Sequence, residues 1–144
     1  MNLDRVRNQL KLDEGRMLRV YKDSVGKLTV GYGRNVSDRP FSEDEITLML
    51  ENDIKRTVEL LDEYLPWWRE LSERRQDVLI NMGYNMGVGP SQEDPTGKLL
   101  TFKNTLLAMQ QGRTADVLSG LRTSLWAKQV GKRATRLIAE WEQG

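Results

Sequence analysis

The chain contains neither cysteine nor histidine. Without cysteine it has no disulfide, so its 144 residues must be held by their own core. A chain of this length buries about two-thirds of its unfolded surface, which suffices for one domain. Because it lacks histidine, it also lacks an imidazole acid, base or metal ligand. A cysteine-free chain tolerates an oxidising or a reducing compartment.

Other absences narrow the possible functions. No apolar run approaches the length of a membrane span, so we expect no membrane insertion. The sequence shows no metal-ligand cluster, phosphate loop or Ser-His-Asp set, so we expect neither a metal nor a cofactor. The chain begins directly with a charged amphipathic segment and no export signal, which predicts synthesis in the cytoplasm. Hydrolysis through carboxylates is the chemistry that the sequence offers.

The hydrophobic pattern predicts an α+β fold with two lobes. A short helix ends near Gly15, and two β-prone stretches, 19–21 and 28–30, flank a turn at 24–27. A capping box at 42–45 opens a helix of about 24 residues that runs to Pro66. Four further helices are expected at residues 72–86, 101–111, 114–121 and 132–142. We therefore predict one domain, 1–144, with a hairpin lobe at about 15–40, an inter-lobe helix at about 43–65 and a helical lobe at about 66–144.

Three side chains in the first 30 residues suit the hydrolysis of a glycosidic bond. Glu14 stands at the end of the first helix, where the helix dipole disfavours a negative charge, as suits a general acid. Asp23 and Thr29 lie on the two arms of the predicted hairpin, close enough to hold a water between them. One proton donor and a water-positioning pair are the minimum for hydrolysis with inversion. Taken singly, a glutamate in a first helix is usually solvated, an aspartate near glycine usually forms a turn, and a threonine in a strand usually reflects β-propensity.

Eight residues separate Glu14 from Asp23, five more precede Thr29, and Gly-Tyr-Gly follows at 31–33. This pattern resembles that of the phage-type lysozymes, glycoside hydrolase family twenty-four. Downstream, NMGYNMG at 81–87 resembles the family's Asn-Met-x-aromatic-polar-Met-Gly helix. Trp126 and RATR at 133–136 resemble its C-terminal Trp and Arg-x-x-Arg segment. These matches follow the family's order from about residue 1 to about residue 142.

The resemblance implies a muramidase that cuts the β-1,4 bond between N-acetylmuramic acid and N-acetylglucosamine in bacterial peptidoglycan. Glu14 would protonate the leaving oxygen, and Asp23 and Thr29 would orient the attacking water. The residues implied to line the sugar cleft are Tyr32, Asn81, Tyr84 and Asn85. Three of these implied contacts have other interpretations. Asn81 and Asn85 stand one helical turn apart and also fit an exposed polar stripe, and an aromatic after a strand, such as Tyr32, is often core packing.

The resemblance also implies a biological setting. It suggests a monomeric bacteriophage endolysin for host cell lysis, with a separate holin that releases it from the host cytoplasm to the cell wall in the periplasm. Two alternatives stay open: a peptidoglycan-binding protein of the same fold with weak catalysis, and a chitinase-like glycosidase of the same mechanism. A nucleic-acid or protein adaptor fits less well, because the net charge is only +1 and basic residues do not interleave with aromatic ones.

Arg34 departs from the family pattern. The family's Gly-x-Gly is usually followed by His, which pairs with an acidic residue on the inter-lobe helix. Here Arg34 follows, and the matching acidic position is Asp53. We predict an Arg34–Asp53 pair; the alternative is a solvated Arg34.

Three further segments carry expectations. The segment 88–98 is longer and more polar than the short connection that follows the Met-Gly motif in the family. Its composition predicts a surface loop that is dispensable for folding. Trp67 and Trp68 fit packing at a helix junction better than sugar stacking. From Thr96 onward there are eight Lys or Arg against three Asp or Glu. This basic third fits attraction to an anionic wall and ordinary solvated helix faces equally well.

Overall fold

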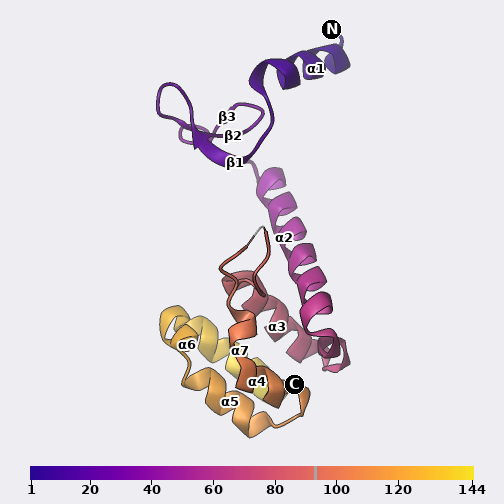
Figure 1. The fold of residues 1–144 in the computed structure, drawn as a ribbon, viewed down its shortest axis with the longest axis vertical. Coiled ribbons are helices and arrows are strands. Elements are labelled where there is room, and N and C mark those ends of the chain that lie inside the picture. The colour runs from indigo at the N-terminus through magenta and orange to yellow at the C-terminus, as the bar shows by residue number, and fades with distance from the viewer. Residues whose placement is uncertain (93) are drawn as a thin grey trace. The chain divides into compact units, whose positions relative to one another are not determined.

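The fold is α+β, as predicted. The structure is a computed structural model that describes residues 1–92 and 94–144. Within these residues, helices predominate and a small three-stranded antiparallel sheet follows the first helix (Figure 1). The chain divides into two compact units, 1–48 and 49–144, and each is described by itself.

The first unit begins with the predicted short helix. Helix α1, Leu3–Glu14, starts at Asn2, whose side chain accepts a hydrogen bond of 3.0 Å from the backbone N–H of Arg5. It ends at Gly15, which has a φ of +72° and donates its N–H to the carbonyl of Lys11. Glycine adopts this φ without steric cost. The sequence rule for a helix C-terminus is therefore confirmed, and it leaves Glu14 as the last helical residue.

The sheet has the order β1-β2-β3. Strands β1 (Met17–Lys22) and β2 (Leu28–Gly31) form the predicted hairpin, with Tyr21 opposite Thr29. The third strand, β3 (Arg34–Asn35), pairs with the other edge of β2 and was not predicted, because two residues are too few to show an alternating pattern. Thr29 therefore lies on the central strand.

Helix α2, Glu43–Tyr64, opens with the predicted capping box. The hydroxyl of Ser42 accepts the N–H of Glu45, and the carboxylate of Glu45 accepts the N–H of Ser42, each at 3.2 Å. These reciprocal bonds satisfy two backbone donors at the start of the helix. The helix ends two residues before Pro66, which has no N–H with which to continue it.

The second unit contains the rest of α2 and the remaining helices. Their bounds are η1 Pro66–Glu70, α3 Glu73–Met86, η2 Leu99–Thr101, α4 Lys103–Gln110, α5 Thr114–Arg122, α6 Leu125–Val130 and α7 Lys132–Gln143. Both α5 and α6 pack against α7 (Figure 1). Helix α6 was not predicted, since its six residues are too short for a helical repeat; it is defined by Ser124, whose hydroxyl accepts the N–H of Ala127. Of the described helices, none is long and apolar enough to cross a membrane.

The hydrophobic core of the described residues lies in the second unit. Its fully buried large side chains are Trp68, Trp141, Leu61, Leu79, Met82, Leu99, Met109 and Leu121. Trp68 is 1% exposed, and its indole N–H donates to Asp62 at 2.8 Å. Trp67 is partly buried against the same core. The packing interpretation of the tryptophan pair is therefore confirmed, and Trp68 has no face for a sugar.

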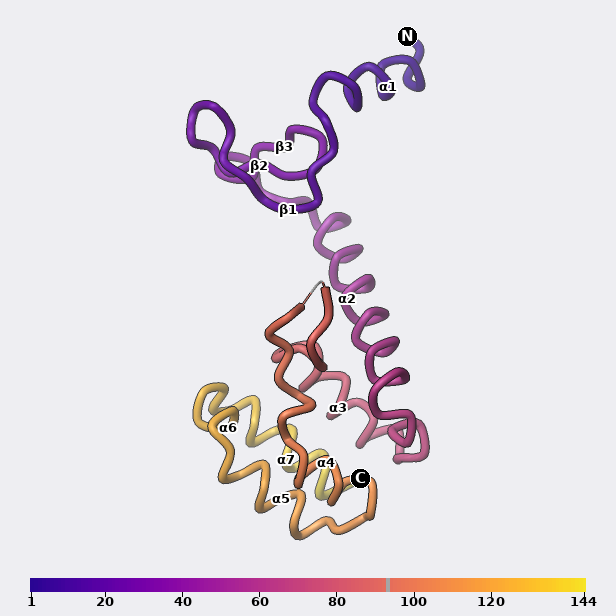
Figure 2. The backbone as a smooth tube through the Cα atoms, in the orientation of Figure 1, coloured from indigo at the N-terminus to yellow at the C-terminus, as the bar shows by residue number. Residues whose placement is uncertain are grey.

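The segment 88–98 is packed at both ends, which corrects the expectation of a wholly exposed loop. Val88 is 1% exposed, and the N–H of Lys98 donates to the carbonyls of Met86 and Gly87, each at 3.1 Å. The chain thus leaves α3 and returns beside its last turn (Figure 2). Backbone hydrogen bonds and close glycine contacts, which composition does not reveal, order these ends. Glu93, within this segment, lies outside the described residues.

We expect Gly97→Ala to destabilise the fold. A methyl group on Gly97 would lie 2.7–2.9 Å from backbone atoms of Gly89, so the backbone on one side of the loop would have to move. Overpacking of this kind costs about 1–3 kcal/mol, measurable by denaturant unfolding. Gln92→Ala, at an exposed position in the same loop, should change stability by less than about 0.5 kcal/mol. Equal stability of the two variants would contradict the packed arrangement.

Candidate active site

The side chain of Glu14 lies against the turn that joins β2 to β3. A methyl group built on Gly33 would lie 2.9 Å from the carboxyl carbon of Glu14 and 3.3 Å from its Cβ, with one carboxylate oxygen closer still. Gly33 also has a φ of +71°, which favours glycine. The Gly-Tyr-Gly motif therefore has a structural reason: the absence of a Cβ at residue 33 makes room for the carboxyl group of Glu14.

Tyr32 lies in the same turn. The ammonium of Lys11, one turn before the end of α1, stands 5.6 Å from the centre of the Tyr32 ring, within the range of a cation–π contact. The ring is 44% exposed, so it does not pack in a core. The end of α1 thus contacts the β2–β3 turn at two points, Glu14 against Gly33 and Lys11 against Tyr32.

Asp23 and Thr29 both bind the backbone of Lys27. One carboxylate oxygen of Asp23 accepts the N–H groups of Val25, at 3.0 Å, and of Lys27, at 2.8 Å. The hydroxyl of Thr29 donates to the carbonyl of Lys27 at 3.0 Å. Thr29 is 3% exposed and Asp23 is half-buried. Within the described residues no direct hydrogen bond joins the two side chains, and Lys27 is their common anchor.

This arrangement leaves specific atoms available for chemistry. The turn-forming interpretation of Asp23 is confirmed, but it uses one of the two carboxylate oxygens. Because the hydroxyl proton of Thr29 is donated to the carbonyl of Lys27, the hydroxyl oxygen acts toward other groups as a hydrogen-bond acceptor. A carboxylate oxygen and a hydroxyl lone pair both accept hydrogen bonds from a water. The first unit therefore carries one carboxyl at a helix end and two hydrogen-bond acceptors that are anchored to the same residue, Lys27.

The candidates in the second unit lie on α3 and are hydrogen-bonded to the C-terminal helices. The amide oxygen of Asn81 accepts from Arg133 at 2.9 Å, and that of Asn85 accepts from the indole N–H of Trp126 at 3.1 Å. Both asparagines are exposed, yet neither belongs to a merely solvated stripe, because its amide orientation is fixed. Tyr84 is 42% exposed and borders, with Asn81 and Arg133, a groove of about 390 Å³ lined mainly by apolar side chains of α2 and α3.

Sequence analysis missed two residues that hold these candidates. Lys27 anchors Asp23 and Thr29 through its peptide group, and no side-chain pattern signals such a role. Arg133 orients Asn81 from 52 residues away. Its signal was present, since RATR and NMGYNMG are both family motifs, but their contact follows only from the fold.

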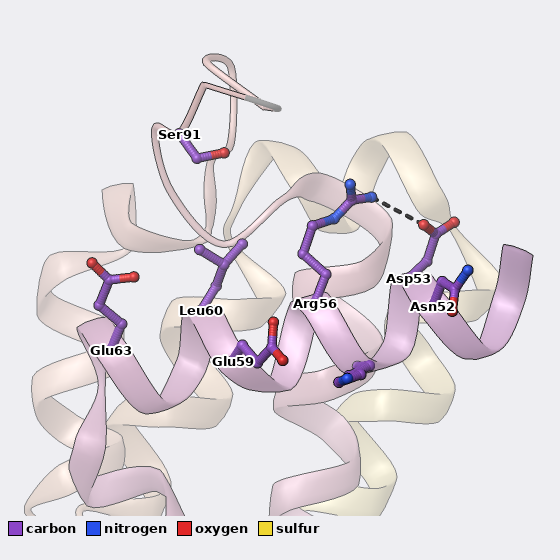
Figure 3. Close-up of a pocket in the computed structure, with 8 residues that line it drawn as sticks. Asn52, Asp53, Arg56, Glu59, Leu60, Glu63 and Ser91 are labelled. Carbon is purple, nitrogen blue, oxygen red and sulfur yellow. Dashed lines mark hydrogen bonds and ion pairs between the residues drawn. The ribbon is translucent and has the colours of Figure 1, made fainter. Parts of the chain in front are cut away.

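A groove larger than the one beside Tyr84 contains none of the predicted site residues. It holds about 470 Å³ along α2, and Ser91 closes one side (Figure 3). Within it Arg56 donates to Asp53 at 3.0 Å, across one turn of the helix (Figure 3). Size alone therefore does not locate the chemistry.

The predicted partner of Arg34 was wrong. Arg34 forms an ion pair with Glu45, in the first turn of α2, and donates at 3.0 Å to the carbonyl of Pro40. Its guanidinium also lies 5.3 Å from the Phe41 ring. Asp53 is engaged instead by Arg56. Arg34 still joins the sheet to the long helix, as expected, but its partner is Glu45. The backbone of Glu45 is already held in place by the capping box with Ser42.

The Arg34–Glu45 pair predicts a pH dependence of stability. Hydrogen bonds from Arg34 and then Ser42 lower the pKa of Glu45 from 4.5 to about 2. A carboxyl with a depressed folded pKa stabilises the fold above its unfolded pKa and loses this contribution as pH falls toward the folded value. The arginine stays charged into the alkaline range. We expect a double-mutant cycle of Arg34→Met and Glu45→Gln to show coupling of melting temperatures at pH 7 that fades as the pH falls from 4.5 to about 2. Zero coupling at pH 7 would contradict the pair.

The fold and the site together define a class of protein. A carboxyl at the end of the first helix, a short antiparallel sheet that carries Asp and Thr, and a helical remainder form an α+β lysozyme-like fold. The phage lysozyme family model matches residues 11–139. The chain belongs to the phage lysozyme family.

Individual relatives agree with this assignment at low identity. The chain is 25% identical over 169 residues to probable T4-type lysozyme 2 of Dictyostelium discoideum, covering 96% of this chain and 94% of that protein. Probable T4-type lysozyme 1 of the same organism gives 25% over 168 residues with the same coverage. The pre-baseplate central spike protein Gp5 of Enterobacteria phage T4 is 27% identical over 156 residues, covering 89% of this chain but 26% of that protein. The family supports a muramidase-like function.

Proposed function

We propose that this protein is an endolysin that hydrolyses the β-1,4 bond between N-acetylmuramic acid and N-acetylglucosamine in bacterial peptidoglycan. One observation carries the proposal: the Glu14 carboxyl rests on the Gly-Tyr-Gly turn of the same sheet on which Lys27 holds Asp23 and Thr29. Family membership supports peptidoglycan as the substrate class.

The three side chains divide the reaction between them. Glu14 donates its proton to the oxygen of the departing sugar. A water donates its two hydrogens to the second carboxylate oxygen of Asp23 and to the Thr29 oxygen, so that its own lone pair is directed at the anomeric carbon. Asp23 then takes up the proton that the water loses on attack. The turn at Lys27 holds both acceptors in fixed geometry before the sugar arrives, which lowers the cost of ordering them.

Four further residues are proposed to contact the glycan. Tyr32 and Tyr84 offer exposed rings to the apolar face of a sugar. Asn81 and Asn85 have their amide oxygens occupied by Arg133 and Trp126, so each presents its NH₂ group as a donor. N-acetyl and hydroxyl oxygens of the glycan are suitable acceptors.

The proposed setting is host cell lysis by a bacteriophage. The protein would be made in the host cytoplasm, act as a monomer and reach the periplasmic face of the wall through a separate holin. In this setting the inner membrane separates the enzyme from the cell wall until the holin releases it.

Purified peptidoglycan tests the proposal against its two alternatives. The protein should release new reducing ends from peptidoglycan and should act on a chitin oligosaccharide of matched length at least about tenfold more slowly. Comparable rates on both would favour a chitinase-like glycosidase. Retention on peptidoglycan without new reducing ends would favour a binding protein.

The stereochemistry of the product tests the role of Asp23. Because Asp23 is anchored beside Thr29 and acts through a water, the first-formed sugar should be the α-anomer. Proton NMR of the earliest product separates the two anomers before they equilibrate. An initial β-anomer would mean a retaining mechanism in which Asp23 attacks the sugar directly.

A further inference from the structure

The turn that follows β3 contains a cluster of hydrogen bonds to which the reaction described above assigns no role. Asn35 ends β3, and its amide oxygen accepts the backbone N–H groups of Ser37, at 2.9 Å, and of Asp38, at 3.1 Å. Its NH₂ group donates to one carboxylate oxygen of Asp38 at 3.0 Å. An asparagine that binds the backbone two and three residues ahead fixes a turn. This turn is therefore closed by its own side chains, although Ser37 and Asp38 are exposed.

The closed turn is bonded to the start of β2. The hydroxyl of Ser37 accepts the N–H of Leu28 at 2.8 Å, and the carbonyl of Leu28 accepts the N–H of Val36, also at 2.8 Å. Both backbone groups of Leu28 are thus satisfied by the turn. Thr29, the next residue, pairs with Asn35 on β3. The residue beside Thr29 is therefore held from the side of the third strand.

Asp38 extends this support to Lys27. Its second carboxylate oxygen accepts the ammonium of Lys27 at 3.1 Å, across 11 residues of the chain. Hydrogen bonds from Asn35 and then from Lys27 lower the pKa of Asp38 below its usual value of 3.8. The carboxylate therefore stays charged at neutral pH, where it can hold the lysine side chain.

The peptide group of Lys27 makes this contact relevant to the reaction. Its N–H donates to Asp23 and its carbonyl accepts the hydroxyl of Thr29. A rotation of Lys27 would therefore move both side chains at once. The rate of a reaction is sensitive to displacements of about 1 Å in a catalytic group. Restriction of Lys27 therefore has a direct consequence for the pair that it anchors.

The Lys27–Asp38 pair fits this role better than a role in stability. The two side chains are 45% and 55% exposed, and exposed ion pairs contribute little to the free energy of unfolding. The Arg7–Asp4 pair is similarly exposed but lies within one turn of α1 and contacts no proposed catalytic residue. The Lys27–Asp38 pair instead joins the hairpin turn to the turn after β3.

We infer that Asp38 is a positioning residue for the hydrolysis: through Lys27 it keeps Asp23 and Thr29 in the arrangement in which they orient the attacking water. Asn35 holds the carboxylate of Asp38 in place for this contact. The inference rests on the proposed function, because it assigns Asp23 and Thr29 to the water. Asp38 itself touches neither the water nor the sugar.

Steady-state kinetics on solubilised peptidoglycan test the inference. In Asp38→Asn the amide keeps one acceptor oxygen for two donors, so we expect kcat to fall about three- to tenfold while KM stays within about twofold. Lys27→Met should cause the same loss, and Lys27→Arg, which keeps the cation, should retain kcat. The double variant Lys27→Met with Asp38→Asn should be no slower than either single variant, because both remove one contact. The matched control is Asp4→Asn, which removes the exposed pair with Arg7 and should change neither constant.

Amide hydrogen exchange tests the same anchor without a substrate. The full chain is labelled with ¹⁵N, and the exchange rate of the Lys27 N–H, which donates to Asp23 at 2.8 Å, is measured by NMR. Asp38→Asn should raise this rate about three- to tenfold, because the anchor opens more often. Asp4→Asn should leave it unchanged.

The inference would be overturned if Asp38→Asn matched Asp4→Asn in kcat or in the exchange of Lys27. It would also be overturned if KM rose at constant kcat, since Asp38 would then be a binding contact, or if the losses of Asp38→Asn and Lys27→Met were additive. Each of these results can occur in a protein that cleaves peptidoglycan. A parent chain that releases no reducing ends would instead reject the proposed function, and faster exchange of Lys27 in Asp38→Asn would still show that Asp38 holds the anchor.

Discussion

Glu14→Gln is expected to lower the rate of peptidoglycan hydrolysis by about 10²–10⁴-fold, because a glutamine amide cannot supply the proton that the leaving sugar oxygen requires. Stability should stay the same or rise, since the substitution removes a charge that the C-terminal end of α1 disfavours. The shape of the side chain is preserved, so its contact with Gly33 should persist. Release of reducing ends and a thermal melt measure the two effects.

The control for this variant is Asp13→Asn, which removes a carboxylate from the preceding position of the same helix. It should retain activity within a few-fold of the original chain. If Glu14→Gln keeps activity within about tenfold, or if both variants lose it equally, Glu14 is not the proton donor.

Gly33→Ala should cause the second-largest loss of activity. The added methyl group would occupy the space of the Glu14 carboxyl, with a separation of 2.9 Å from its carbon, so the carboxyl must move. Displacement of a catalytic group by about 1 Å can cost about 10²-fold in rate. The residue also keeps a φ of +71°, which strains alanine by about 1 kcal/mol.

Gly112→Ala separates the two effects of that substitution. Gly112 has the same φ of +71°, but a methyl group there meets no atom within 4 Å. Both variants should therefore lose similar stability, while Gly33→Ala alone loses activity. Similar activity in the two would show that the position of Glu14 does not depend on residue 33.

Features set by neighbouring residues were predictable from sequence. The end of α1 at Gly15 and the reciprocal cap of Ser42 and Glu45 involve partners within four residues, whose chemistry a short motif specifies. The hairpin that carries Asp23 and Thr29 followed from β-prone stretches around a turn. These local elements placed three candidate residues in one unit.

Contacts between distant segments were not predictable. Asn85 meets Trp126 across 41 residues, and no spacing rule connects the two. The partner of Arg34 was mistaken because the family pattern was transferred to a longer side chain, which reaches the first turn of α2 instead of Asp53. The loop at 88–98 was misjudged because burial of Val88, backbone hydrogen bonds and close glycine contacts order its ends, and composition does not reveal them.

The identity of the new reducing end tests the central claim most directly. Peptidoglycan digested by the protein is reduced with borohydride, and the resulting sugar alcohol is identified by mass spectrometry. A muramidase that uses Glu14, Asp23 and Thr29 yields muramitol, and the yield disappears in Glu14→Gln. Glucosaminitol, or release of peptides without any new sugar alcohol, would contradict the account.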